Sequence, residues 1–290
     1  MTYAFHIIVI LGLYVMLATS LNLLTGYCGL VSLCHAAFYG VGGYFTALVV
    51  DRLGVPFLVG LPLCALASAA LSLLISLPSV KLRGDYFVLA SFGFQMVTFS
   101  ILYNWTELTG GPAGLAGIKH PNVAGLVVDS VPQYAALSGV LAVTCVLAAW
   151  WFVERSRLGL HMKAVRDNEV TAETLGVSKV VTRITAFAVS AGMAALAGCV
   201  FAHYMSFIDP TSFSASESIF ILSVVVIGGL GTIRGSVVGA VVMVLLPEVL
   251  QFLQIPQAVA PHARQVIYGA TLVALMFLRQ QGLAGRYRLG

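Results

Sequence analysis

The sequence predicts an all-α polytopic membrane protein with about 8–10 transmembrane helices. Charged residues make up 9% of the 290 residues, whereas a soluble domain contains about 25%. Hydrophobic residues reach 59%, and a water-soluble fold cannot hide so much apolar side chain behind so little polar surface. The apolar residues gather in runs of about 17–25 residues, the length at which a helix crosses a bilayer. These runs lack the alternation of barrel strands, so we expect helices, whose backbone amides are satisfied internally in lipid.

Seven apolar runs are expected to cross the bilayer, and two further runs are marginal. The seven runs are Tyr3–Leu24, Val31–Val50, Val55–Leu77, Tyr86–Tyr103, Gln133–Val153, Ile184–Tyr204 and Gly235–Leu253. Of the marginal runs, Ser218–Gly228 is short, and His262–Leu278 is free of charge only from Gln265 onward. The first run has neither a basic stretch before it nor a small-residue cleavage site, so we expect a retained span rather than a signal peptide.

The positive charges indicate which loops lie in the cytoplasm. When nine spans are counted with the C-terminus inside, twelve Lys and Arg residues lie inside and three outside. The inside residues are Lys81, Arg83, Arg155, Arg157, Lys163, Arg166, Lys179, Arg183, Arg234, Arg279, Arg286 and Arg288, and the outside residues are Arg52, Lys119 and Arg264. Because cytoplasmic loops carry an excess of Lys and Arg, this asymmetry predicts a cytoplasmic C-terminus. The side of the N-terminus depends on Val31–Val50, which contains three glycines and would leave the N-terminus inside if it re-entered.

The longest inside loop, residues 154–183, is unusually rich in charge. It holds ten of the 15 Lys and Arg and 11 Asp and Glu residues of the chain. Met162, Val165, Glu169, Ala172 and Leu175 follow a helical spacing, and Gly176 stands where a C-cap would end that helix. One interpretation is a solvated connector between two spans, since charge runs are usually solvated faces. The other is a helix that docks onto a water-soluble partner.

No motif for nucleotide binding or for catalysis is found in the sequence. The dipeptide Gly-Lys never occurs, and the glycine-rich stretch Gly228–Gly235 fits neither a P-loop nor a dinucleotide fingerprint. The nucleophile-elbow and zincin motifs are absent as well. The five cysteines lie scattered in apolar segments without metal-ligand spacing, so we expect packing residues rather than a metal site. These features favour a transport protein over an enzyme.

An ion-coupled secondary transporter or a channel is the main alternative. Such proteins keep ionisable residues in mid-span for coupling ions or selectivity. Here the candidates are sparse and lie toward span ends: Glu217, Glu248, His35 and His203. A membrane chain without its own energy source, and with one charged cytoplasmic helix, is better explained by docking onto a motor supplied by another chain.

The loop sequence SRLGLHMKAVRDNEVTAETLGV resembles the cytoplasmic coupling region of ABC-importer permeases of the branched-chain amino-acid class, LivM type. The matching residues are Ser156, Arg157, Gly159, Ala164, Val165, Arg166, Asp167, Asn168, Glu169, Ala172, Glu173, Gly176 and Val177. Four further blocks match in family order: Leu21–Tyr44, Leu77–Phe94, Thr109–Ile118 and Val224–Leu250. A departure is Cys34, where the family usually has Gly. The resemblance therefore covers most of the chain.

This resemblance implies a type II ABC-importer-like fold, with residues 1–290 as one permease domain in the bacterial inner membrane. It implies a homologous LivH-type permease, two ATP-binding subunits, a periplasmic binding protein and surrounding lipid as partners, and no nucleic acid. No cofactor is expected in this chain, because ATP would be bound by the partner subunits. The substrates implied are leucine, isoleucine and valine, although urea and short-amide permeases share these motifs. The residues expected to couple to the ATPases are Arg157, Arg166, Asp167, Glu169, Glu173 and Gly176.

A zwitterion with an apolar side chain needs dipoles along its pathway more than charges, and broken helices supply them. Two short glycine-marked segments, Ser32–Gly43 and Ser212–Gly231, lie in the two halves of the chain. The pathway residues expected from them are Ser32, His35, Gly40, Gly42, Gly43, Gly228, Gly229 and Gly231. The equally weighted alternative is that these glycines only let helices approach closely.

Overall fold

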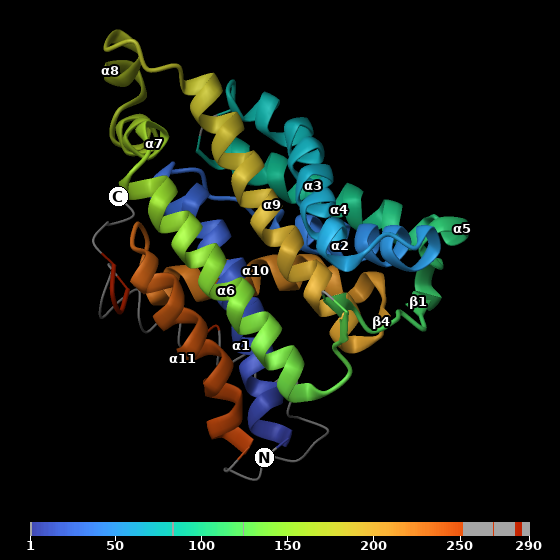
Figure 1. Ribbon diagram of the computed structural model, residues 1–290. Coiled ribbons are helices and arrows are strands. Elements are labelled where there is room, and N and C mark those ends of the chain that lie inside the picture. The colour runs from blue at the N-terminus through green and yellow to red at the C-terminus, as the bar shows by residue number, and fades with distance from the viewer. Residues whose placement is uncertain (1, 83, 124, 252–268, 270–281, 286–290) are drawn as a thin grey trace.

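The computed structural model describes the whole chain except residues 1, 83, 124, 252–268, 270–281 and 286–290. The described part is a bundle of membrane-length helices (Figure 1). Five helices are long and apolar enough to cross a membrane: α1 (Thr2–Asn22, continued by a π-helical turn Leu23–Tyr27), α3 (Phe57–Ser79), α4 (Asp85–Asn104), α6 (Val131–Glu154) and α9 (Lys179–Met205). The polytopic all-α fold predicted from composition is confirmed.

Helices α1 and α9 form the centre of the bundle. In their most apolar windows 72% and 67% of the residues are buried, against 33% for α3 and 28% each for α4 and α6. The difference has a sequence basis in α9, whose inner stretch Ala191–Gly198 is rich in alanine and glycine. Small side chains let neighbouring helices approach closely when no water drives them together.

Two of the expected spans differ from the structure. The run Val31–Val50 is helical only from His35, as α2 (His35–Thr46) followed by a π-helical stretch (Ala47–Arg52), and is too short to count as a full span. The run Ser218–Gly228 is not a separate span. It belongs to α10 (Ala215–Gly228), which meets α11 (Ile233–Gln251) at a bend of 118°, so the pair forms at most one broken span or a re-entrant loop.

The marginal run His262–Leu278 lies outside the described residues apart from Gly269. The described helices therefore give five spans by length, or six if the bent pair counts as one. The bend follows from the glycines between α10 and α11, because Gly229 and Gly231 have φ values of +116° and +71°. Residues with a Cβ rarely adopt this conformation, and glycine does so without strain.

The two ends of the bundle carry different structure. One end, called here the loop end, holds the short helices α7 (Arg157–Asp167) and α8 (Glu169–Thr174). The opposite end holds α5 (Thr106–Thr109), two 3₁₀ turns (Gly111–Ala113 and Pro210–Phe213) and two antiparallel strand pairs. The strands are β1 (Leu115–Ala116) with β4 (Phe207–Ile208), and β2 (Asn122–Val123) with β3 (Leu126–Val127).

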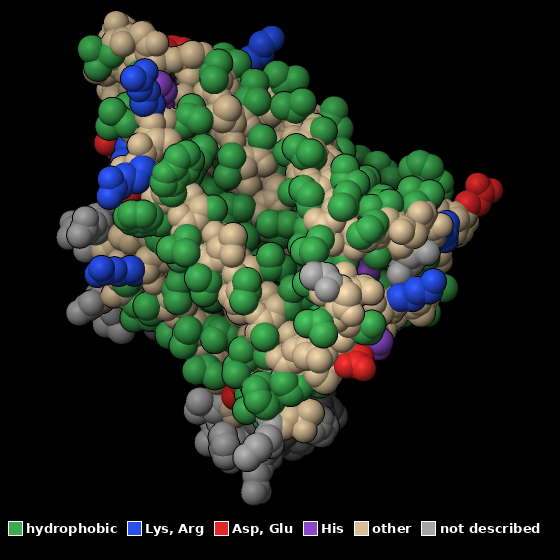
Figure 2. All heavy atoms as spheres, in the orientation of Figure 1, with side chains coloured by type: hydrophobic (Ala, Val, Ile, Leu, Met, Phe, Trp, Pro, Cys, Tyr) green, Lys and Arg blue, Asp and Glu red, His purple; other side chains and the backbone are tan. Residues whose placement is uncertain are grey.

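One face of the bundle is apolar between the two ends. Figure 2 shows hydrophobic side chains covering the face over α6, α9 and α3, while charged side chains lie toward the ends. Large exposed side chains of α3 and α6 include Leu66, Leu74, Val143, Leu147 and Trp151. A contiguous apolar band of this kind would be unstable in water and is the outer surface expected of a protein in lipid.

Candidate functional site

Three polar residues begin the three helices at the loop end. Ser156 accepts a hydrogen bond from the Gly159 amide and starts α7. Asn168 accepts from the Thr171 amide at 2.9 Å and starts α8, and Ser178 caps the start of α9. Short polar side chains at these positions satisfy amides that have no partner inside the helix. The loop is therefore an ordered structure fixed by its own sequence.

The loop is not the single helix that the apolar spacing predicted. Asn168 is extended, with φ −160° and ψ 109°, and separates α7 from α8. Asparagine competes with the helix for backbone hydrogen bonds, which explains the break. The expected end at Gly176 is confirmed, because its φ is +84°. The last residues of the 154–183 segment, from Lys179 onward, are the first turns of α9.

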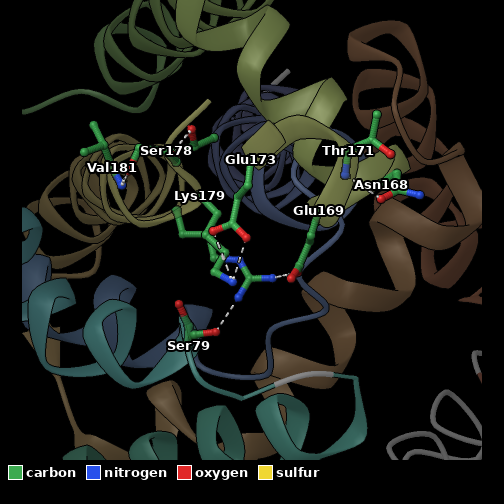
Figure 3. A network of polar contacts seen from close by, with 10 residues as sticks. Ser79, Asn168, Glu169, Thr171, Glu173, Ser178, Lys179 and Val181 are labelled. Atoms are coloured by element: carbon green, nitrogen blue, oxygen red, sulfur yellow. Dashed lines mark hydrogen bonds and ion pairs between the residues drawn. The ribbon is translucent and has the colours of Figure 1, made fainter. Parts of the chain in front are cut away.

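A buried ion pair fixes α8 to the membrane bundle. Arg183 of α9, whose side chain is 3% exposed, pairs with Glu169 of α8. The same guanidinium donates through Nη1 to the carbonyl oxygen of Ser79 at the end of α3, at 2.5 Å. Figure 3 shows this network, with the neighbouring pair of Glu173 and Lys179 beside it. The Arg183 side chain thus joins α9 to the neighbouring α8 and to the end of α3, 104 residues earlier in the chain.

A second arginine fixes α7 to the end of α1. Arg166 donates through Nη1 to the carbonyl oxygen of Gly26 at 2.8 Å and pairs with the neighbouring Asp167 at 2.9 Å. Its alkyl chain packs on Gly29, where an added Cβ would lie 2.9 Å from the arginine Cγ. Arg166 and Glu169, both expected to face the ATPase, therefore turn inward and hold the loop.

The outward face of the loop combines apolar and charged side chains. Leu175 and Val170 are 78% and 63% exposed. They lie at the end of the bundle, beyond the apolar band, where lipid would not cover them (Figure 1). Among the expected coupling residues, Arg157, Asp167, Glu173 and Gly176 are exposed. Exposed apolar residues rimmed by charge mark protein interaction surfaces. This face can bind a protein while its inner face stays anchored.

A cavity of about 320 Å³ lies under the loop. It is lined by residues that follow α1, that precede α4, and that belong to α7, α8 and α9. Among them, Cys28 is buried, and burial raises the pKa of its thiol to about 12. The thiol therefore stays protonated near neutral pH and is a packing group, as the sequence indicated. Within the described residues, no three His, Cys, Asp or Glu side chains gather where they could hold a metal ion.

The expected pathway residues near the start of α2 are buried. The Nε2 atom of His35 lies 2.9 Å from the hydroxyl of Ser190, which donates to the carbonyl of Ser20 at 2.5 Å. Ser32 lies beside Cys34, with 3.1 Å between Oγ and Sγ. His35 thus joins α2, α9 and α1 in this conformation, as a hydrogen-bonded packing residue does.

Two backbone amides at the N-terminal end of α2 already have hydrogen-bond partners inside the bundle. The Ala36 amide donates to the Ser218 hydroxyl at 2.9 Å, and the Ala37 amide donates to Oε1 of Gln95 at 2.8 Å. Gln95 is buried and also donates to the Phe213 carbonyl. Sequence reasoning missed Gln95, although an amide in the middle of an apolar span is a signal of function or of a structural need.

The expected pathway glycines lie at helix contacts. An added Cβ at Gly42 would overlap the backbone of Ala195 on α9, and at Gly40 it would lie 2.8 Å from the Phe213 ring. A Cβ added at Gly43 would lie 3.2 Å from the Gly198 carbonyl oxygen. In the other group, a Cβ at Gly228 would overlap Gly235, which brings α10 and α11 together. Both groups of glycines are thus closely packed in this conformation.

Comparison with known proteins identifies relatives along nearly the whole chain. The model of the family described as "Branched-chain amino acid transport system / permease component" matches residues 3–276. The chain is 31% identical over 293 residues to the high-affinity branched-chain amino acid transport system permease protein LivM of Salmonella typhimurium, covering 93% of this chain and 67% of that protein. The Escherichia coli LivM is 30% identical over the same extent.

A second group of relatives covers less of the chain. The autoinducer 2 import system permease protein LsrC of Salmonella paratyphi B is 32% identical over 179 residues, which is 58% of this chain and 49% of that protein. No solved structure gives a significant match.

Proposed function

The chain belongs to the branched-chain amino acid transport system permease family, and from this premise we propose that it is the membrane-spanning permease subunit of an ATP-driven importer. Its substrates in this proposal are leucine, isoleucine and valine. The LivM relatives support this choice, since their similarity extends over 93% of the chain, whereas the similarity to LsrC extends over 58%. The LsrC relatives also indicate that the wider family imports other compounds.

The observation that carries the ATP-driven mechanism is the anchored loop of α7 and α8. Its inner face is held by Arg166 and Arg183, while Val170 and Leu175 are exposed on its outer face. In the proposal, this outer face docks onto an ATP-binding subunit. The exposed charges Arg157, Asp167 and Glu173 then set the register of the contact, because rim charges govern specificity and association rate more than affinity.

The positive charges support the proposed orientation in the membrane. Lys81, Arg234 and the cations of α7 belong to the loop end, where Ser79 meets Arg183 and Thr232 meets Asn22. Lys119 lies at the opposite end, beside His203. Since cytoplasmic loops are rich in Lys and Arg, the loop end is proposed to face the cytoplasm together with the C-terminus. A periplasmic binding protein would then meet the opposite end.

The remaining partners and the pathway are also part of the proposal. Residues 1–290 act as one permease domain beside a homologous LivH-type permease, with two ATP-binding subunits below. Substrate would pass along the broken helices α2 and α10, near Ser32, His35 and the glycines of the two segments. Because these groups are packed in this conformation, the pathway would open when α2 and α10 move apart.

The energy source of uptake tests the proposal against an ion-coupled transporter. We expect uptake of radiolabelled leucine by cells carrying the complete transporter to continue when the proton gradient is collapsed and ATP is maintained. Uptake should stop when ATP is depleted with the gradient intact. Transport by this chain alone in proteoliposomes, driven by a proton or sodium gradient, would overturn the proposal.

A further inference from the structure

The break between α10 and α11 is held by segments from outside that helix pair. After Gly228 the chain no longer continues the helix, and the carbonyls of Ile227 and Gly228 accept hydrogen bonds from the amides of Leu283 and Ala284, both at 2.9 Å. Thr232 donates to the carbonyl of Ala284 at 2.8 Å. These bonds satisfy two backbone carbonyls where the helix ends, as burial in a membrane protein requires.

Asn22 of α1 joins the break to the centre of the bundle by three hydrogen bonds. This residue is 1% exposed and bonds to three groups of the break. Its Nδ2 donates to the Thr232 carbonyl and to the Ser236 hydroxyl, each at 2.8 Å, and its Oδ1 accepts from the Gly231 amide at 3.0 Å. Both amide protons and the carbonyl oxygen of the Asn22 side chain are thus hydrogen-bonded to residues 231–236 at the break.

The next turn of α1 connects this site to the loop. Directly after Asn22, α1 changes to a π-helical turn that contains Gly26. An added Cβ at Gly26 would overlap both Asn22 Oδ1 and the Gly231 amide, so the backbone there packs directly on that hydrogen bond. The carbonyl of the same residue accepts the bond from Arg166 of α7. One glycine therefore touches the loop on one side and the break on the other.

The contacts along this line are short and mostly involve backbone atoms. A long, exposed side chain absorbs displacement by changing rotamer, whereas a glycine packed on a buried amide cannot. π-Helical turns are also common at functional sites, where a helix must change its hydrogen-bond register. These contacts form a continuous line from α7 to the end of α1 and onward to the break.

We propose that Asn22 is a positioning residue that couples the α7–α8 loop to the α10–α11 break through Gly26 and Arg166. The inference rests on the proposed function, in which a partner ATPase moves that loop. The break is then the element that changes angle when ATP is bound or hydrolysed. Asn22 keeps that angle matched to the position of the loop.

The test measures transport per ATP in proteoliposomes that contain the permease pair, the ATP-binding subunits and the binding protein. Two variants disturb the link from opposite sides: Asn22→Ala removes the three hydrogen bonds, and Gly26→Ala forces a methyl group into them. We expect each to retain the ATP-binding subunits and stimulated hydrolysis, while leucine transported per ATP falls at least about fivefold, the lower end of typical coupling between sites. This ratio does not depend on how much protein assembles.

Two further variants make the result decisive. Gly12→Ala on the same helix, where a Cβ would lie 3.0 Å from the Ser138 hydroxyl, should leave the ratio unchanged. If Asn22→Ala does not assemble, Ser236→Ala removes one of its three bonds and should lower the ratio by a smaller amount. An unchanged ratio in Gly26→Ala and Ser236→Ala, with coupled wild-type transport, overturns this inference alone. Absence of ATP-dependent transport in the wild type overturns the proposed function instead.

Discussion

Replacing Glu169 by alanine is expected to lower the free energy of unfolding by about 3 kcal/mol, because removing one partner of a buried ion pair leaves an uncompensated charge. The side chain of Arg183 is only 3% exposed, and its pair with Glu169 and its bond to the Ser79 carbonyl hold α8, α9 and α3 together. The measurement is the temperature at which the purified protein loses its monodisperse peak in detergent.

The matched control uses the more exposed pair of Lys179 and Glu173 in the same loop. The glutamate side chain of that pair is 44% exposed, and exposed ion pairs contribute about 0–1 kcal/mol. Glu173→Ala should therefore leave the transition nearly unchanged. A double variant in which Arg183 is also replaced by methionine should recover part of the loss, because the unpaired charge is gone. Equal stability of Glu169→Ala and Glu173→Ala would show that the buried pair does not hold the loop.

Gly198→Ala is expected to cost about 3 kcal/mol or to prevent assembly, because overpacking a closely packed helix contact costs about 1–3 kcal/mol when side chains can yield. Here they cannot. The added methyl group would overlap the Tyr39 carbonyl and lie 2.8 Å from the Gly43 amide, so α2 would have to move away from α9 as a whole. The yield of folded protein after extraction in detergent measures the effect.

Gly139 of α6 is the control for the intrinsic effect of the substitution. No atom lies within 4 Å of a Cβ built there, and alanine in a helix is favoured over glycine by about 1 kcal/mol. Gly139→Ala should be neutral or slightly stabilising. If Gly198→Ala gives the same yield as Gly139→Ala, the contact of α2 with α9 is not as close as the structure describes.

Regular spans could be predicted from the sequence because their signal is local. α3, α4 and α6 begin and end within two residues of the apolar runs, since lipid requires about the same helix length everywhere. The ends of α2 and α10 could not be predicted this way. Apolar residues extend beyond both helices, to Leu33 before α2 and to Leu230 after α10. The chain is not helical at these two residues because of tertiary packing.

The loop shows a similar division between local and distant causes. Gly176 could be predicted as a helix end, because its preference for a left-handed conformation is a property of the residue itself. The roles of Arg166 and Glu169 could not. Their partners, Gly26 and Arg183, are 140 and 14 residues away, and composition alone cannot tell an inward charge from an outward one.

A photo-crosslinking amino acid at position 175 directly tests whether α8 contacts an ATP-binding subunit. Leu175 is 78% exposed on the loop, and Leu126, 74% exposed on β3 at the opposite end, is the matched control. In membranes that contain the whole transporter, a crosslinker in place of Leu175 should capture an ATP-binding subunit, and one in place of Leu126 should not. Capture from position 126 alone, or none from position 175 in an assembled and active transporter, would contradict the docking of α8.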